Sequence, residues 1–183
     1  MRRDCTRFAA PSVHRAMKLP LPLAFTLALA ACGMTPPAAH ASPVFDPFKF
    51  FLGRSHGDAQ LKIITKDYKS VSVDSVGRVD GDTLVIDQHI SVRGESSKDR
   101  QWRLRRDGPG KYSGTLTEAT GPVTAEVEGD RLHIRYPSKD GAVEQWLSLA
   151  PDTTYADNRL TVKKLGIVVA TLEETITRRG GPM

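Results

Sequence analysis

The sequence predicts an all-β fold: an antiparallel up-and-down meander of about ten strands closed into a barrel, with a β-sandwich as the alternative. Strand-like segments recur about every ten residues, and turn dipeptides such as Asp80-Gly81 and Asp140-Gly141 separate them. No segment beyond residue 47 has a hydrophobic repeat of 3.6 residues. The predicted strands are residues 58–66, 70–79, 82–93, 100–106, 111–118, 121–128, 131–137, 142–150, 153–162 and 166–177.

Alternation within the segments predicts which face of each strand is buried. In residues 82–93, one face of the strand carries apolar side chains and Gln88 at every second position. The intervening positions, which face the other side, include Asp87, His89 and Ser91. A membrane barrel would turn its apolar face outward and would have longer strands with aromatic girdles. The connections are short, which favours antiparallel neighbours, and closing the sheet removes its two exposed edges. We therefore expect a water-soluble barrel over residues 48–178, with a disordered tail at 179–183.

The segment before the first strand is rich in aromatic residues. Phe45, Phe48, Phe50 and Phe51 lie within seven positions and precede Gly53. We expect one helical turn there that plugs an end of the barrel. Residues 32–47 before it are rich in Ala and Pro and predict a flexible tether.

Residues 1–31 have the features of a secretory signal peptide. Basic residues precede an apolar run, Leu19 to Ala31, which is shorter than the roughly 20 residues that span a bilayer. The run ends in Leu29-Ala30-Ala31-Cys32, which resembles the lipobox of bacterial lipoproteins. This predicts cleavage between Ala31 and Cys32 and lipidation of Cys32. Cleavage after Ala41, leaving a soluble periplasmic protein, is the alternative.

Net charge and the residue after the cysteine indicate where the protein resides. Gly33 takes the position where Asp would retain a lipoprotein in the inner membrane, so we expect an outer-membrane lipoprotein facing the periplasm. Five basic residues and one acid lie in residues 1–31, which leaves 21 basic and 20 acidic residues beyond them. The net charge beyond residue 31 is therefore close to zero, which predicts that the protein has no nucleic-acid partner. The expected partner is the membrane, through the anchor, and we expect a monomer.

Several short motifs, taken in order, resemble one known family. They are Phe50-Phe51-Leu52-Gly53, Asp80-Gly81-Asp82-Thr83-Leu84, Arg100-Gln101-Trp102, Gly108-Pro109-Gly110-Lys111-Tyr112-Ser113-Gly114, Arg135-Tyr136, Asn158-Arg159 and Lys164-Leu165-Gly166. Together they are similar to an uncharacterised family of small proteobacterial lipoproteins, domain of unknown function three-eight-three-three. The resemblance implies a calycin-like or lipocalin-like barrel and a lipoprotein address. It implies no activity.

Four residues are candidates for lining a ligand cavity inside the barrel: Gln88, Trp102, Tyr136 and Trp146. Gln88 stands at an inward position between apolar residues, where it either pairs with a neighbouring strand or contacts a ligand. The three aromatic residues either pack in the core or line an apolar cavity, for which we expect several hundred Å³.

A basic stretch near the last predicted strands is a second candidate. Asn158, Arg159 and Lys164 either form a solvated turn and strand or contact an anionic headgroup at the barrel mouth. Asp87 and His89 have no third ligand nearby, so we expect no metal and no cofactor. No catalytic motif is present, which argues against an enzyme, a hydrolase or isomerase being the weak alternative.

The sequence thus favours a membrane-anchored periplasmic lipoprotein that binds a lipid or other apolar ligand in its barrel. The alternative is a non-catalytic envelope interaction protein with a solid core. An enzyme of unknown reaction is the weaker alternative.

Overall fold

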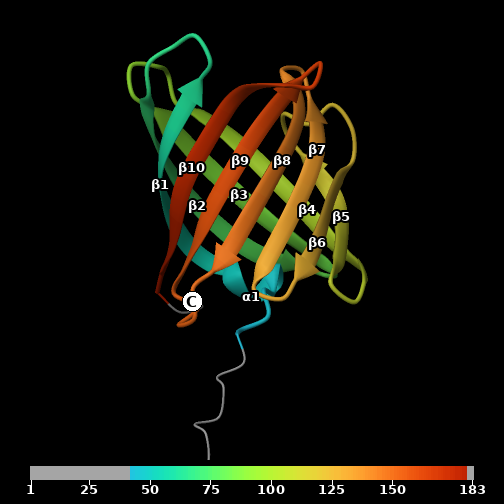
Figure 1. The fold of residues 1–183 in the computed structure, drawn as a ribbon. Coiled ribbons are helices and arrows are strands. Elements are labelled where there is room, and N and C mark those ends of the chain that lie inside the picture. The colour runs from blue at the N-terminus through green and yellow to red at the C-terminus, as the bar shows by residue number, and fades with distance from the viewer. Residues whose placement is uncertain (1–41, 181–183) are drawn as a thin grey trace, which may run out of the picture. The chain divides into compact units, whose positions relative to one another are not determined.

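The fold is a closed barrel of ten antiparallel strands. The computed structural model describes residues 42–180, and the predicted signal peptide and most of the predicted tether lie outside them. Each strand pairs with its neighbours in sequence, and β10 pairs with β1 to close the sheet (Figure 1). The up-and-down barrel is therefore confirmed, and the sandwich is not formed. The strands are β1 (Gly53–Ile63), β2 (Lys69–Asp80), β3 (Thr83–Val92), β4 (Lys98–Gly108), β5 (Lys111–Leu116), β6 (Val123–Glu128), β7 (Arg131–Ser138), β8 (Gly141–Leu149), β9 (Tyr155–Lys164) and β10 (Ile167–Arg179).

All ten predicted strands are present, and the largest error is at the start of β1. This strand begins at Gly53, five residues before the predicted start. Its first inward positions hold Ser55 and Gly57, so hydrophobic alternation gives no signal there. At the other end β10 continues to Arg179, one residue into the predicted tail.

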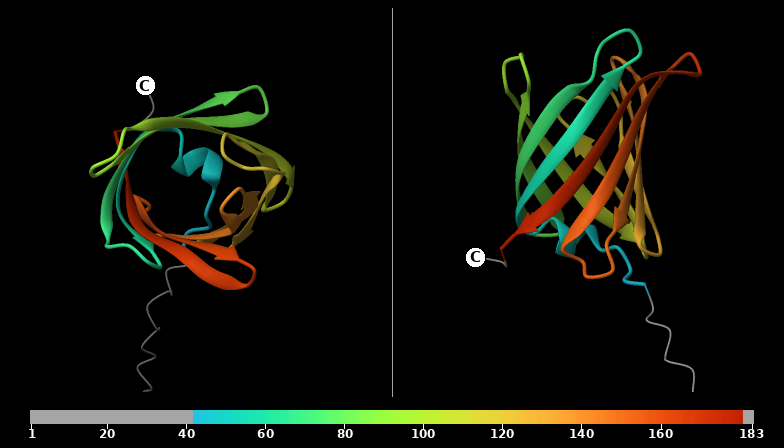
Figure 2. Two further views of the ribbon diagram at one scale, coloured as in Figure 1. Left: turned by 90° about the horizontal axis from the view of Figure 1, so that it is seen from above. Right: turned by 60° about the vertical axis from the view of Figure 1, so that its left-hand side comes forward.

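A single helical turn closes one end of the barrel, as the aromatic cluster predicted. Helix α1 (Pro47–Phe50) begins after Asp46, whose Oδ1 accepts a hydrogen bond of 3.0 Å from the Phe48 N–H. The rings of Phe45, Phe48, Phe50 and Phe51 are buried against the strands. Figure 2 shows α1 inside the barrel outline when viewed along the axis. The Phe45 N–H donates to the Gly129 carbonyl at 2.8 Å, so ordered packing begins within the predicted tether.

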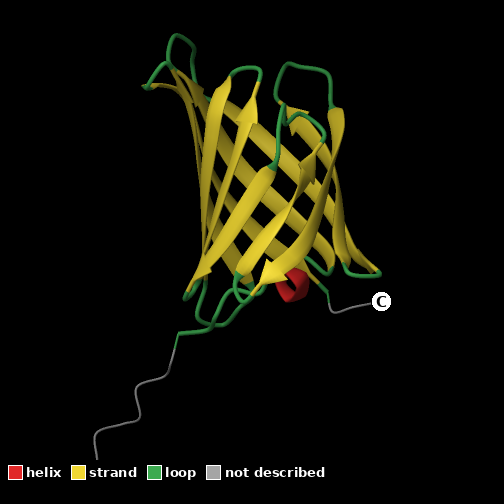
Figure 3. Ribbon diagram, turned by 90° about the vertical axis from the view of Figure 1, so that its right-hand side faces the viewer, coloured by secondary structure: helices red, strands yellow, loops and turns green. Residues whose placement is uncertain are grey.

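The two ends of the barrel differ in how completely they are filled. Figure 3 shows α1 at one end and only loops at the other. Buried apolar residues form a large cluster that includes the α1 rings, and a separate small cluster on β1, β2 and β3. Away from α1, several inward apolar side chains are only half-buried: Leu61, Val92, Leu160, Val162 and Leu172. The end opposite α1 is therefore open to solvent.

Within residues 42–180, no helix has the length and apolar character needed to cross a membrane.

Candidate functional site

A layer of polar side chains crosses the barrel interior between the two apolar clusters. Gln88, Arg100, Asn158 and Glu174 occupy inward positions on β3, β4, β9 and β10. Three of them lie between apolar residues of the same face, and Arg100 precedes such a run. The β-sheet register sets Gln88 beside Arg100 and Asn158 beside Glu174. All four line one cavity inside the barrel, so the two pairs face a common space.

Both polar atoms of the Gln88 side chain are hydrogen-bonded to neighbouring strands. Its Oε1 accepts hydrogen bonds from Arg100 Nε at 2.7 Å and from Trp102 Nε1 at 2.8 Å, and its Nε2 donates to Ser75 Oγ at 2.9 Å. Arg100 also donates to Glu118 Oε1 at 2.9 Å. Gln88 is therefore a core amide bonded to neighbouring strands, and it borders the cavity as well.

Asn158 and Glu174 form the other half of the layer. Asn158 Nδ2 donates to Glu174 Oε2 at 2.8 Å, whereas Asn158 Oδ1 is buried without a hydrogen-bond partner. A Cβ atom at Gly57 would lie 2.0 Å from Glu174 Oε1, so the missing side chain at Gly57 makes room for the carboxyl group. An unpaired buried acceptor costs roughly 1–3 kcal/mol, which makes Asn158 Oδ1 a candidate ligand contact.

Burial raises the pKa of Glu174 above its ordinary value, although the hydrogen bond from Asn158 and the charge of Arg100 oppose this shift. The folded state therefore binds the proton more tightly than the unfolded state does. Protonated Glu174 therefore contributes stability that is fully present below its pKa in the unfolded state. This contribution is lost as the pH rises through the higher pKa of the folded state. Glu174→Gln removes the titration and keeps an oxygen that can accept from Asn158.

We expect Glu174→Gln to be more stable relative to wild type at pH 8 than at pH 4. Urea unfolding of both proteins at several pH values measures this difference, and because other groups titrate alike in both proteins, the difference isolates Glu174. A difference that does not change with pH would contradict the raised pKa.

Two of the three aromatic candidates lie inside the barrel. Trp102 and Tyr136 are buried, with their rings edge-to-face and their centroids 5.6 Å apart. Burial raises the pKa of the Tyr136 hydroxyl to about 12. Both residues pack in the core, and Trp102 also lines the interior cavity.

Trp146 lies on the outer face of the barrel, which corrects the expectation that it lines the interior. On β8 the inward positions are held by Val143, Gln145 and Leu147, so Trp146 must point outward. Its ring stacks on His133 with centroids 3.8 Å apart, and the Arg131 guanidinium lies 4.8 Å from the ring centroid.

The three predicted headgroup contacts are not brought together. Asn158 points into the barrel, and Arg159 points outward, where its guanidinium lies 3.1 Å from Glu173 Oε1. Lys164 is exposed at the open end of β9. Adjacent residues of a strand face opposite sides, so Asn158 and Arg159 cannot contact one headgroup from the same face.

The interior cavity is much smaller than expected. Its volume is about 30 Å³, room for about one water molecule, rather than several hundred Å³. The large side chains of Phe51, Trp102, Leu104, Ile134 and Leu147 fill the half of the barrel near α1.

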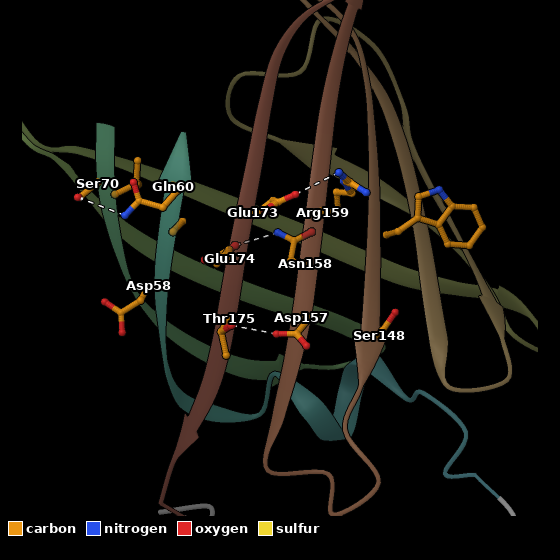
Figure 4. Close-up of a pocket in the computed structure, with 13 residues that line it drawn as sticks. Asp58, Gln60, Ser70, Ser148, Asp157, Asn158, Arg159, Glu173, Glu174 and Thr175 are labelled. Atoms are coloured by element: carbon orange, nitrogen blue, oxygen red, sulfur yellow. Dashed lines mark hydrogen bonds and ion pairs between the residues drawn. The ribbon is translucent and has the colours of Figure 1, made fainter. Parts of the chain in front are cut away.

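A depression of about 660 Å³ opens on the outer face of the barrel, and Asn158 and Glu174 of the interior layer also line it (Figure 4). Strands β1, β2, β8, β9 and β10 form it, with Trp146 among its lining residues. Its polar side chains pair across strands: Thr175 Oγ1 donates to Asp157 Oδ1 at 2.9 Å, and Arg159 pairs with Glu173. Most of its lining side chains are therefore polar, and several of them are paired with each other, whereas Asn158 Oδ1 has no hydrogen-bond partner.

The Asp87 and His89 side chains belong to separate pairs on the outer face. Asp87 contacts Arg78 and Gln101, and His89 Nδ1 lies 2.7 Å from Asp99 Oδ1. Over residues 42–180, no group of three His, Cys, Asp or Glu side chains is placed to hold a metal ion.

Sequence reasoning missed Arg100 and Glu174 as members of the interior layer. The signal for Glu174 was present, because it stands between Leu172 and Ile176 in the alternation of β10. Arg100 stood two positions before Trp102, on the same face.

Solved structures with a similar fold come from distant proteins. The S-type phycobiliprotein lyase CPES from Guillardia theta has a TM-score of 0.56 at 12% identity, covering 73% of this chain and 91% of the lyase. Rv2717c from M. tuberculosis has a TM-score of 0.57 at 17% identity, covering 74% of this chain and 99% of that protein. A DUF3598 protein of unknown function from Nostoc punctiforme has a TM-score of 0.51 at 13% identity, covering 76% of this chain and 51% of its own. At these identities the likeness shows the calycin-like barrel fold alone.

Sequence comparison gives the family. No curated protein matches the chain. The model of the family described as protein of unknown function DUF3833 matches residues 26–178, which include the end of the apolar run, the segment up to α1 and nearly the whole barrel. The resemblance inferred from the short motifs is thereby confirmed, and the chain belongs to the DUF3833 family.

Proposed function

We propose that this protein is a lipid-anchored envelope protein whose barrel binds a single-chain lipid. The acyl chain lies along the apolar walls of the open half, and its polar head reaches the interior polar layer. Anchoring at Cys32 and an outer-membrane location facing the periplasm are part of the proposal, and Cys32 lies outside the described residues.

The observation that carries this proposal is the unpaired Asn158 Oδ1 beside a cavity that also borders Arg100 and Glu174. A carboxyl head group could donate its O–H to Asn158 Oδ1 and accept from the Arg100 guanidinium.

The walls above the polar layer support the binding of the chain. Five half-buried apolar residues (Leu61, Val92, Leu160, Val162 and Leu172) face inward from β1, β3, β9 and β10. An acyl chain lying against them would remove more of their apolar surface from water, which contributes about 25 cal/mol per Å².

The test uses the full lipoprotein, extracted from membranes, and palmitate as the probe. We expect native mass spectrometry to show one bound lipid per chain and palmitate to exchange with it. Leu172→Trp would fill the open half and should weaken palmitate binding at least tenfold. Glu173→Trp places the same side chain on the outer face of β10 and should leave binding unchanged.

A chain that carries no lipid and binds no palmitate would sink the lipid-binding proposal. An equal affinity of Leu172→Trp and wild type would show that the lipid does not occupy the open half. The first outcome would favour the second candidate function, a non-catalytic envelope interaction protein. That function is favoured by the nearly filled interior and by the outer depression of about 660 Å³. The monomeric state and the absence of catalysis stay predictions.

A further inference from the structure

Exposed apolar side chains gather at the open end of the barrel, on two loops. The β1–β2 loop carries Ile64 and Tyr68, which are 61% and 68% exposed. The β9–β10 turn and the start of β10 carry Leu165, Ile167 and Val168, which are 97%, 62% and 42% exposed. The Ile64 N–H donates to the Val169 carbonyl at 3.0 Å, which joins the two segments. We call these five residues the rim patch; its two loops lie at the end opposite α1 (Figure 2, right).

Leu165 is unfavourable at its position in two respects. Its φ of 51° is left-handed, as is the φ of 81° at Gly166, and a two-residue hairpin turn of this kind normally has Asn-Gly. A leucine in this conformation is strained, and its side chain is almost wholly exposed to water. Strain of this kind concentrates at functional contacts. Leu165 therefore points to an apolar partner outside the barrel.

Lysines surround the rim patch. Lys62 and Lys69 flank the β1–β2 loop, Lys66 lies within it, and Lys163 and Lys164 precede Leu165. Lys69 pairs with Glu95, and Lys163 lies 3.5 Å from Glu144. Lys62, Lys66 and Lys164 have no acidic partner within 4.0 Å among the described residues, and Asp67 is the one acid in the β1–β2 loop.

Tyr68 and the lysines of its loop are held together. The Lys62 Nζ atom lies 4.8 Å from the centre of the Tyr68 ring and donates to the Lys66 carbonyl at 2.8 Å. Aromatic rings beside basic residues are typical of segments that lie at the boundary between lipid headgroups and acyl chains.

We propose that the rim patch docks on an anionic lipid bilayer, with Leu165, Ile64 and Tyr68 entering the interface and Lys62, Lys66 and Lys164 contacting headgroups. This deepens the proposed function, because it sets the open end of the barrel on the surface that would supply a lipid. The residues of the rim patch and its lysines take no part in the interior site. Membrane docking and palmitate binding can therefore fail independently of each other.

The predicted anchor permits this orientation although the chain enters the barrel at the α1 end. The thirteen residue steps from Cys32 to Phe45 span at most about 45 Å when extended. The twelve residues of β2, tilted as in other barrels, give a height of about 30 Å. The tether is therefore long enough for the anchor and the rim patch to reach one bilayer.

The test uses residues 42–183, because the described part of the chain is a closed barrel with its own core and plug. Without the leader and Cys32, any binding comes from the barrel. We expect it to sediment with phosphatidylglycerol–phosphatidylcholine vesicles and at least tenfold less with phosphatidylcholine alone. Leu165→Asn should weaken binding about tenfold while leaving the melting temperature equal or higher, since Asn suits the turn. Each of Lys62→Gln, Lys66→Gln and Lys164→Gln should weaken binding roughly fivefold and reduce its salt dependence.

Val79→Asn is the matched control, because Val79 is 47% exposed at the other end of β2 and should leave binding unchanged. Equal binding of wild type and Leu165→Asn would overturn the proposal, as would equal binding to neutral and anionic vesicles. A dimer that Leu165→Asn converts to a monomer, with no vesicle binding, would assign the patch to a second copy of the chain and also overturn it. Failure of vesicle binding leaves the palmitate result untouched.

Discussion

Gly77→Ala should lower the free energy of unfolding by about 3 kcal/mol, one of the two largest effects that we expect of a single substitution. Gly77 lies on β2 where the end of α1 crosses the inner face of the sheet. A Cβ atom there would lie 1.8 Å from the Phe51 carbonyl oxygen and 2.8 Å from its carbonyl carbon. Both are backbone atoms, so no side-chain rotation can relieve the contact. The variant must move the plug away from β2 and loosen the packing of Phe50 and Phe51.

Urea unfolding of wild type and variant measures this loss. Gly108→Ala is the matched control, because nothing lies within 4 Å of a Cβ at Gly108 and its φ is outside the left-handed range. It should change the free energy of unfolding by no more than about 0.5 kcal/mol. If Gly77→Ala were as stable as Gly108→Ala, the close approach of α1 to β2 would be wrong.

Cys32→Ala should abolish lipidation of the protein, the second large effect. The chain has two cysteines, Cys5 and Cys32, and only Cys32 follows the apolar run and two small residues. An alanine has no thiol to carry diacylglycerol, so incorporation of radiolabelled palmitate should fall to background. Cys5→Ala is the matched control and should keep full labelling.

Mass spectrometry of the mature N-terminus completes this test. We expect wild type to begin with an acylated Cys32. A mature chain that begins at Ser42 without an acyl group would instead favour ordinary cleavage after Ala41 and a soluble periplasmic protein. Labelling that survives in Cys32→Ala would show that another group carries the lipid.

The alternation that predicted the strands also held most of the information about the interior. It correctly turned Gln88 and Tyr136 inward, and it would have turned Trp146 outward had it been applied to residues 142–150. There Trp146 shares a face with Glu144 and Ser148, whereas Val143 and Leu147 share the other. The error arose because large aromatic residues were assigned to the core by type and not by position.

The sequence by itself determined the strand number, the antiparallel meander, the aromatic plug and the family, because period-two alternation and turn residues act over a few positions each. Only the tertiary structure decided that Asn158 of β9 contacts Glu174 of the neighbouring strand β10, that the interior cavity has a volume of about 30 Å³, and that Ile64 lies beside the start of β10. These contacts depend on the register of paired strands and on how the barrel closes. Neither is encoded within one strand, since each is settled by the packing of all ten around a common core.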